Sequence, residues 1–179
     1  MARLVAEKAD LLPALDECFR EHGYEGASLA RISAATGLGK GSLYHFFPGG
    51  KEEMLSTVLA EIDGWFEREV FAPLRPGEPG GALAMIDAVD GYFRSGRRVC
   101  LVGALALTDS RDRFAEAIKS YFERWVEALA MSFGSSVGAQ RSAEEIVAVI
   151  QGAILLSRAL NDPGVFSRSM DGLRRRFGD

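Results

Sequence analysis

Residues 28–51 have the sequence SLARISAATGLGKGSLYHFFPGGK, which carries the local signals of two short helices joined by a tight turn. Ser28 is a favourable N-cap for the first helix, because its hydroxyl can accept a hydrogen bond from a free backbone N–H. Leu29 and Ile32 follow at helical spacing and begin one apolar stripe. Gly37 suits the left-handed residue with which many helices end. The stretch therefore predicts a helix-turn-helix unit.

The second short helix is expected after Gly39, with Leu43 and Phe47 facing inward. The residues left on its outer side are small, cationic or carry a ring with a polar atom: Lys40, Gly41, Ser42, Tyr44 and His45. A helix with such a face can lie in a DNA major groove, with its N-terminal residues near base edges. Its cation and hydroxyls would then lie near phosphates. Lys51 begins the next helix and is predicted near a phosphate, the alternative being a solvated lysine.

The order and spacing of these residues resemble the helix-turn-helix of TetR-family transcriptional regulators over roughly the first third of the chain. The resemblance is carried by Phe19, Gly23, Tyr24, Ser28, Ile32, Ala35, Gly37, Lys40, Gly41, Leu43, Tyr44, Phe47 and Lys51-Glu52-Glu53. The tail FFPGGKEEML is similar to a subset of the family with PGGK at this point. Gly39 stands where the family usually has serine or threonine, so a phosphate contact from a capping side chain does not carry over. The residues expected at DNA are Ser28, Arg31, Lys40, Gly41, Ser42, Tyr44, His45 and Lys51, with Ser28 and Arg31 placed for contacts to the DNA backbone.

A nucleotide-binding loop is the alternative interpretation of the same glycines. The phosphate-binding P-loop requires a glycine, four residues, and then Gly-Lys-Ser or Gly-Lys-Thr. Here Gly39-Lys40 is followed by Gly41, and Ala34 occupies the place of the first glycine. The dinucleotide-binding pattern fails as well, because Ser42 occupies its last glycine position. The spacing therefore excludes both motifs.

Length and composition favour a cytoplasmic protein with a sizeable core. The chain has 179 residues, enough for one large or two small domains, and 47% of them are hydrophobic. It contains no run of eighteen apolar residues, so we expect no membrane-spanning helix. Glu7 and Asp10 interrupt the apolar N-terminus, which argues against a signal peptide. Cys18 and Cys100 lie in apolar helical contexts and are expected to be reduced.

The net charge of −4, from 21 basic and 25 acidic residues, is unfavourable for a DNA-binding protein. The distribution of charge matters more than the total, because the contacting face determines the electrostatic attraction to DNA. Residues 28–51 contain no acid, whereas Arg31, Lys40 and Lys51 supply three cations. We therefore expect moderate non-specific affinity for DNA and a modest dependence on salt.

The remaining periodicity predicts an all-α protein of about nine helices, divided into residues 1–47 and 48–179. A first helix is expected within residues 2–21 and should end at Gly23. It either bends at Pro13 or begins near Asp10, which would place the proline in the tolerated first turn. A long helix should run from Lys51 to about Ala72. Further helices are expected over residues 82–94, 99–108, 111–133, 143–160 and 165–177, with Ser142 and Glu145 forming a capping box.

The last two helices are candidates for a subunit interface. Residues 143–160 are apolar on nearly all sides, and such a helix requires burial all round. Together with the final helix, they resemble the element with which TetR-family subunits form a four-helix dimer interface, while burial within one chain is the alternative. The residues expected there are Ile146, Val149, Ile150, Ile154, Val165, Phe166, Met170 and Leu173.

The resemblance also implies a ligand pocket within residues 48–179. Candidates for its lining are Trp65, Met85, Phe93, Cys100, Leu107, Phe122, Trp125 and Gln151. Aromatic side chains with few polar atoms suit a small apolar or aromatic molecule. Each residue taken singly could instead belong to the core. Gln151 is the most informative, because an amide in an apolar helix needs a hydrogen-bond partner.

The chain is not expected to be an enzyme or to hold a metal or another cofactor. Its two histidines lack metal-ligand spacing, and no nucleophile–base grouping is present. The resemblance implies a ligand-responsive repressor that binds a palindromic operator as a homodimer. Two alternatives are a helical interaction protein without DNA binding, favoured by the acidic balance, and a regulator that senses oxidants through Cys100. The apolar neighbours of Cys100 favour an inert buried thiol.

Overall fold

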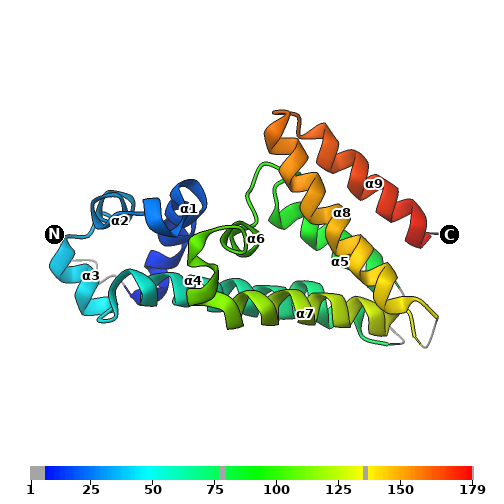
Figure 1. Ribbon diagram of the computed structural model, residues 1–179, viewed down its shortest axis with the longest axis horizontal. Coiled ribbons are helices and arrows are strands. Elements are labelled where there is room, and N and C mark those ends of the chain that lie inside the picture. The colour runs from blue at the N-terminus through cyan, green and yellow to red at the C-terminus, as the bar shows by residue number, and fades with distance from the viewer. Residues whose placement is uncertain (1–6, 77–79, 135–136, 179) are drawn as a thin grey trace.

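The chain is described by a computed structural model over residues 7–76, 80–134 and 137–178. Within these residues it forms nine α-helices and no β-strand, which confirms the all-α prediction. The helices are α1 (Lys8–Gly26), α2 (Leu29–Thr36), α3 (Lys40–Phe46), α4 (Gly50–Phe66), α5 (Gly81–Tyr92), α6 (Leu101–Leu105), α7 (Ala115–Ser132), α8 (Ala139–Ala159) and α9 (Gly164–Gly178). In Figure 1, α1–α3 lie at one end, α8 and α9 lie towards the other, and α4 and α7 run lengthwise between them.

α1 begins at Lys8, two residues before Asp10, and Asp10 is not its N-cap. Its N-cap is Glu7, whose backbone N–H donates to the Asp10 carboxylate at 2.8 Å in a capping box. Pro13 lies inside the helix, beyond its first turn. The bend comes at Gly23, which has φ of +67°, a conformation that glycine adopts without steric cost. The capping box explains the earlier start, because it satisfies free N–H groups of the first turn.

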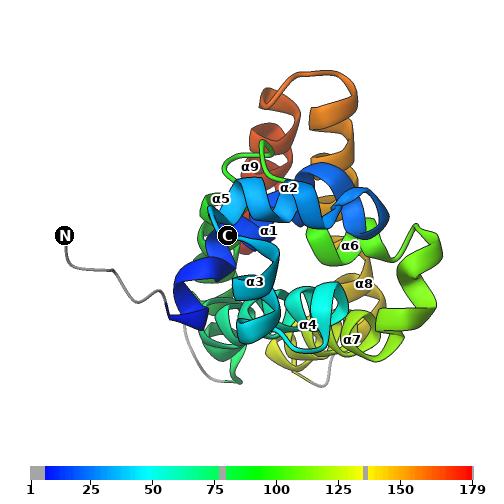
Figure 2. The same ribbon diagram turned by 90° about the vertical axis from the view of Figure 1, so that its left-hand side faces the viewer.

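α2 and α3 form the expected helix-turn-helix. The Ser28 hydroxyl accepts a hydrogen bond from the Arg31 backbone N–H at 3.3 Å, and Gly37 ends α2 with φ of +70°. Ile32, Leu43 and Phe47 have no exposed surface, so they anchor the two helices to the core beneath. Figure 2 shows α1, α2 and α3 gathered on the side that faces the viewer.

The long helix predicted from Lys51 to Ala72 is present but irregular at its end. α4 stops at Phe66 and continues as a π-helical turn over Glu67–Phe71 and a 3₁₀ turn over Ala72–Leu74. The wider turn brings Phe71 and Leu74 inward alongside Phe66. Burial of these apolar side chains therefore outweighs regular helical hydrogen bonding here.

Two predictions about the C-terminal helices were wrong in detail. α6 covers only Leu101–Leu105, and Leu107 lies beyond it with 85% of its surface exposed. α8 begins three residues before Ser142, with Gly138 as its N-cap, so the predicted capping box is absent. The left-handed Gly138, with φ of +92°, starts the helix earlier than the side-chain pattern indicates. No helix in the described ranges combines the length and apolarity needed to span a membrane.

Candidate nucleic-acid interface and adjoining cavity

The outer face of α3 brings five predicted residues together at one end of the molecule. Lys40, Gly41, Ser42, Tyr44 and His45 are all exposed. The Tyr44 ring retains 40% of its surface exposed, with the Lys40 ammonium 6.0 Å from its centroid. Leu43 is fully buried on the opposite side, so α3 presents its polar residues outward on a firmly packed base. This face has a cation, hydroxyls and bare backbone, which suits contact with phosphates and base edges.

Two further predicted residues lie at the start of α2. The Ser28 hydroxyl is occupied as a cap, and the exposed Arg31 guanidinium donates to the Gly26 carbonyl at 2.7 Å. Gly50 lies beside the same face, since a Cβ at this residue would be in van der Waals contact with the Tyr44 ring, 3.4 Å from Cε1. Its φ of +68° also favours glycine. The PGGK turn thus leaves room for the Tyr44 ring.

Lys51 takes a position that neither alternative described. Its ammonium donates to the Tyr24 carbonyl at 2.8 Å and lies 4.3 Å from the centroid of the Tyr24 ring. The side chain is half-buried and fastens the start of α4 to α1. A phosphate contact would require this lysine to leave Tyr24.

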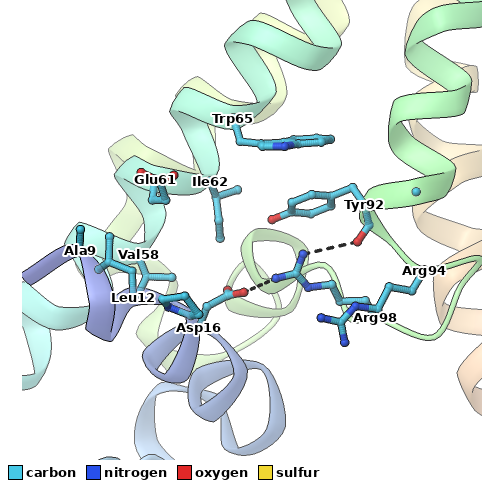
Figure 3. A pocket seen from close by; sticks show the side chains of 12 residues that line it. Ala9, Leu12, Asp16, Val58, Glu61, Ile62, Trp65, Tyr92, Arg94 and Arg98 are labelled. Atoms are coloured by element: carbon cyan, nitrogen blue, oxygen red, sulfur yellow. Dashed lines mark hydrogen bonds and ion pairs between the residues drawn. The ribbon is translucent and has the colours of Figure 1, made fainter. Parts of the chain in front are cut away.

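A cavity of about 520 Å³ lies between α1, α4 and the end of α5. Figure 3 shows Leu12, Val58 and Ile62 on one side, with Tyr92 and Arg98 on the other. Trp65 closes one end and packs on Tyr92, with ring centroids 4.5 Å apart. The volume falls in the range of small-molecule sites.

A buried ion-pair network forms the polar wall of this cavity. Asp16 accepts two hydrogen bonds from Arg20 Nε, at 2.8 and 2.9 Å, and pairs with Arg98. Arg20 also donates to the Tyr92 hydroxyl at 2.7 Å and to the Val99 carbonyl. Burial raises the pKa of Tyr92 to about 12, against the opposing effect of the two arginines. The network joins α1 to the segment between α5 and α6.

Sequence reasoning missed this network. The only signal was the opposite charge of Asp16 and Arg20 at i,i+4, which is also usual on solvent-exposed helix faces. Arg98 is separated from Asp16 by 82 residues, so nothing local connects them.

The eight residues predicted to line a ligand pocket do not surround one cavity. Trp65 alone among them lines the cavity beside α1. Met85, Phe93, Cys100 and Trp125 are buried in the core, Phe122 and Gln151 are half-buried, and Leu107 is exposed. Helical periodicity marks inward positions but does not separate core from cavity lining. Gln151 still lacks a partner for its Nε2 atom among the described residues, as do the buried Tyr121 hydroxyl and Trp125 Nε1.

Most of the residues predicted for a subunit interface are already buried within the chain. Six of them are buried within the chain: Ile146, Ile150, Ile154, Phe166, Met170 and Leu173. Val165 is half-buried, and Val149 is 44% exposed. Because residues 143–160 are apolar all round, the sequence could not tell which face turns inward. The large apolar side chains exposed here are instead Val149, Leu155 and Leu156 on α8 and Leu160 just beyond its end. Val149, Leu156 and Leu160 follow one helical stripe, which we call the α8 stripe.

Metal-binding geometry was also sought. Across the parts of the chain that the structure describes, no three His, Cys, Asp or Glu side chains form a group suited to a metal ion.

Comparison with known families supports the interpretation of both halves of the chain. Residues 11–58 match the family model for bacterial regulatory proteins of the tetR family. Residues 83–171 match the C-terminal domain model of LmrA/YxaF-like transcriptional regulators. The first match covers α2 and α3, and the second covers most of the C-terminal helices.

Individual relatives agree with the family matches. Over 159 residues the chain is 30% identical to the HTH-type transcriptional regulator LmrA of Bacillus subtilis, covering 82% of this chain and 84% of that protein. It is 41% identical over 59 residues to the HTH-type transcriptional repressor AcnR of Corynebacterium efficiens, covering 33% and 30%. The fold is similar to that of a cysteine mutant of the TetR-family regulator CifR solved with 26-bp double-stranded operator DNA. That structure has a TM-score of 0.73 and 23% identity, over 96% of this chain and 98% of that chain.

Proposed function

The chain belongs to the TetR family of transcriptional regulators, and we propose that it is a homodimeric repressor that binds an inverted repeat in DNA and is released by a small apolar effector. The observation that carries the proposal is the exposed α3 face, with Lys40, Ser42, Tyr44 and His45 on one side of a buried Leu43. Gly41 allows the backbone to approach the duplex, and Arg31 and Ser28 flank the same face. Lys51 contributes a phosphate contact if it leaves Tyr24.

The outward apolar stripe of α8 supports the proposed homodimer. Val149, Leu156 and Leu160 expose 44%, 50% and 65% of their surface, and a second copy would cover them. Two α3 helices held about 34–36 Å apart could read successive major grooves of a palindrome. The division into a DNA-binding part, residues 1–47, and a C-terminal part, residues 48–179, belongs to this proposal. Separate family matches over residues 11–58 and 83–171 support two parts, although the first match extends past residue 47 into α4.

Repression and release by a ligand complete the proposal. AcnR is a transcriptional repressor and LmrA is a transcriptional regulator, which supports a cytoplasmic regulator without enzymatic activity. An effector must bind the DNA-free arrangement more tightly than the DNA-bound one to release the operator.

Selection of genomic fragments by the purified protein tests the proposal. We expect an enriched inverted repeat, and we expect Tyr44→Ala to lose specific binding while the oligomeric state is unchanged. Arg141→Ala is the control, because this side chain is 85% exposed at the start of α8, far along the chain from α3. Failure of the wild-type protein to enrich any repeat, or full operator affinity in Tyr44→Ala, would contradict the proposal.

A further inference from the structure

The cavity beside α1 has an apolar side and a cationic side (Figure 3). Leu12, Val58 and Ile62 supply the apolar side, and Trp65 closes it with an aromatic ring. On the other side the Arg98 guanidinium lies 4.6 Å from the centroid of the Tyr92 ring. A ligand in this space would therefore meet hydrocarbon on one side and a guanidinium on the other.

Arg98 lines the cavity and already has partners in the protein, because Nη1 donates to the Tyr92 carbonyl at 3.5 Å and Nη2 pairs with Asp16. Its Nε atom is buried and has no hydrogen-bond partner among the described residues. The Glu17 carboxylate is 3.8 Å from this nitrogen, beyond hydrogen-bonding distance. Its ion-pair partner Asp16 is also held by two hydrogen bonds from Arg20, so Asp16 does not depend on Arg98.

The surrounding cluster carries an excess of positive charge. On this wall the guanidinium groups of Arg20, Arg94 and Arg98 pair with two carboxylates, those of Asp16 and Glu17, while the exposed Glu61 lies on the opposite, α4 side of the cavity. Arg98 keeps only 18% of its side chain exposed, so water compensates its charge poorly. Removing a charge from water is costly unless a partner of opposite sign is present. An anion at this wall would give Arg98 a further partner of opposite charge.

We propose that this cavity binds a small organic acid, with an aromatic or aliphatic body on the apolar side and a carboxylate on Arg98. A planar guanidinium can donate two parallel hydrogen bonds to a carboxylate, which gives both affinity and orientation. The inference rests on the proposed function, because it names the chemical class of the effector.

The position of this site explains how binding of the acid would affect the DNA-binding helices. Asp16 lies on α1, which leads into the helix-turn-helix, whereas Arg98 lies between α5 and α6. The ligand carboxylate competes with Asp16 for Arg98 and removes an ion pair that joins these two parts. Asp16 retains Arg20, so no carboxylate loses all of its partners. The acid therefore favours arrangements in which α1 has moved from Arg98, as population shift requires.

A cationic ligand is the competing possibility, because Glu61 lies at the α4 side of the cavity. Glu61 is exposed, and water screens its charge. A cation bound there would also share the cavity with Arg94 and Arg98. The more deeply buried charge belongs to Arg98, so the arrangement favours an acid.

Calorimetric titration of the full-length protein tests the site with three probes of matched shape: 1-naphthoate, the neutral 1-naphthamide and the cation 1-naphthylmethylammonium. We expect naphthoate to bind about tenfold more tightly than naphthamide or the cation. Arg98→Gln should reduce naphthoate affinity to the level of naphthamide. Asp16→Asn should raise naphthoate affinity, because it removes the competing carboxylate. Arg97→Gln is the matched control, since this exposed neighbour does not line the cavity.

Leu12→Trp provides a second variant that leaves every charge in place. It fills the apolar side and should abolish naphthoate binding while DNA binding persists. Equal affinities for naphthoate and naphthamide, or an unchanged naphthoate affinity in Arg98→Gln, would overturn the proposal. Tighter binding of the ammonium, lost in Glu61→Gln, would assign the cavity to cations.

DNA affinity with and without naphthoate is measured separately on the selected fragments. We expect naphthoate to weaken operator binding by the wild-type protein and not by Leu12→Trp. A protein that binds naphthoate but no DNA would contradict the proposed function and leave the acid site standing. A protein that binds DNA but no acid would contradict only the acid site.

Discussion

A substitution at Gly41 should affect the stability of α3 and its contact with DNA differently. A Cβ at this position would meet no protein atom within 4 Å, and alanine favours a helix over glycine by up to about 1 kcal/mol. We therefore expect Gly41→Ala to leave the melting temperature unchanged or slightly raised. Its added methyl group would project from the DNA-facing backbone, so operator affinity should fall about tenfold, or about 1.4 kcal/mol.

The control for this prediction is Gly91→Ala. Gly91, on α5, also has open space around an added Cβ but lies on a different element. It should change the melting temperature in the same sense and leave operator affinity unaltered. Full operator affinity in Gly41→Ala would show that the backbone of α3 does not approach the duplex.

Cys100 distinguishes the ligand-responsive regulator from the redox-sensing alternative. Burial raises the pKa of the Cys100 thiol above its ordinary value, although the Gly103 backbone N–H, 3.3 Å from Sγ, has the opposite effect. At pH 8 the unreactive thiol therefore dominates, and the reactive thiolate forms only at higher pH. We expect slow alkylation of the native protein by iodoacetamide at pH 8 and rapid alkylation after denaturation, followed by mass spectrometry. Rapid labelling of Cys100 in the folded protein would instead favour redox sensing.

At the start of α5, the backbone of Gly81 lies against the backbone of the preceding 3₁₀ turn. A Cβ on Gly81 would clash with the Pro73 carbonyl oxygen and lie 3.0 Å from its carbon. Because the obstacle is backbone, the 3₁₀ turn at Ala72–Leu74 would have to move. We expect Gly81→Ala to destabilise the protein by about 1–3 kcal/mol, which corresponds to a loss of several degrees in melting temperature. Thermal unfolding of Gly81→Ala and of the control Gly91→Ala measures this loss of stability. Equal melting temperatures of the two variants would contradict the close packing at Gly81.

The elements that could be predicted from the sequence are those with local signals. Ser28 and Gly37 mark both ends of α2, and the structure uses both as caps. The π-helical turn after Phe66 could not be predicted, because it results from burial of Phe71 and Leu74 against distant helices. The inward face of α8 was equally hidden, since its apolar residues surround the helix.

In the proposed dimer, the α8 stripe joins the two subunits. Leu156 is 50% exposed at the centre of this stripe, so Leu156→Asp would place a charge in the subunit interface without disturbing the chain's own core. We expect a monomer by light scattering and at least tenfold weaker operator binding, because one α3 cannot span a palindrome. Leu107→Asp is the control, being 85% exposed on another segment. A dimeric Leu156→Asp protein would show that another surface joins the subunits.

The sequence predicts the α3 face but not the cavity beside α1, because the cavity is formed by residues that are far apart in the chain. Lys40, Ser42, Tyr44 and His45 share one face of one helix, so periodicity alone places them together. The cavity beside α1 combines residues from three helices and a connecting segment. Its ion pair joins residues 82 positions apart, Asp16 and Arg98, and single-sequence patterns carry no information about such a contact.

Salt dependence tests how a protein of net charge −4 can bind a polyanion. The logarithm of the binding constant falls with the logarithm of salt concentration by about 0.9 for each phosphate contact. Lys40 is exposed on α3 and occurs twice in a dimer, so Lys40→Ala should make this slope shallower by about 2. Lys51→Ala should alter the slope less, because its ammonium is bound to the Tyr24 carbonyl. Arg141→Ala should leave it unchanged. An equal effect of Lys40→Ala and Lys51→Ala, measured by fluorescence anisotropy between 50 and 200 mM salt, would mean that Lys51 leaves Tyr24 when DNA binds.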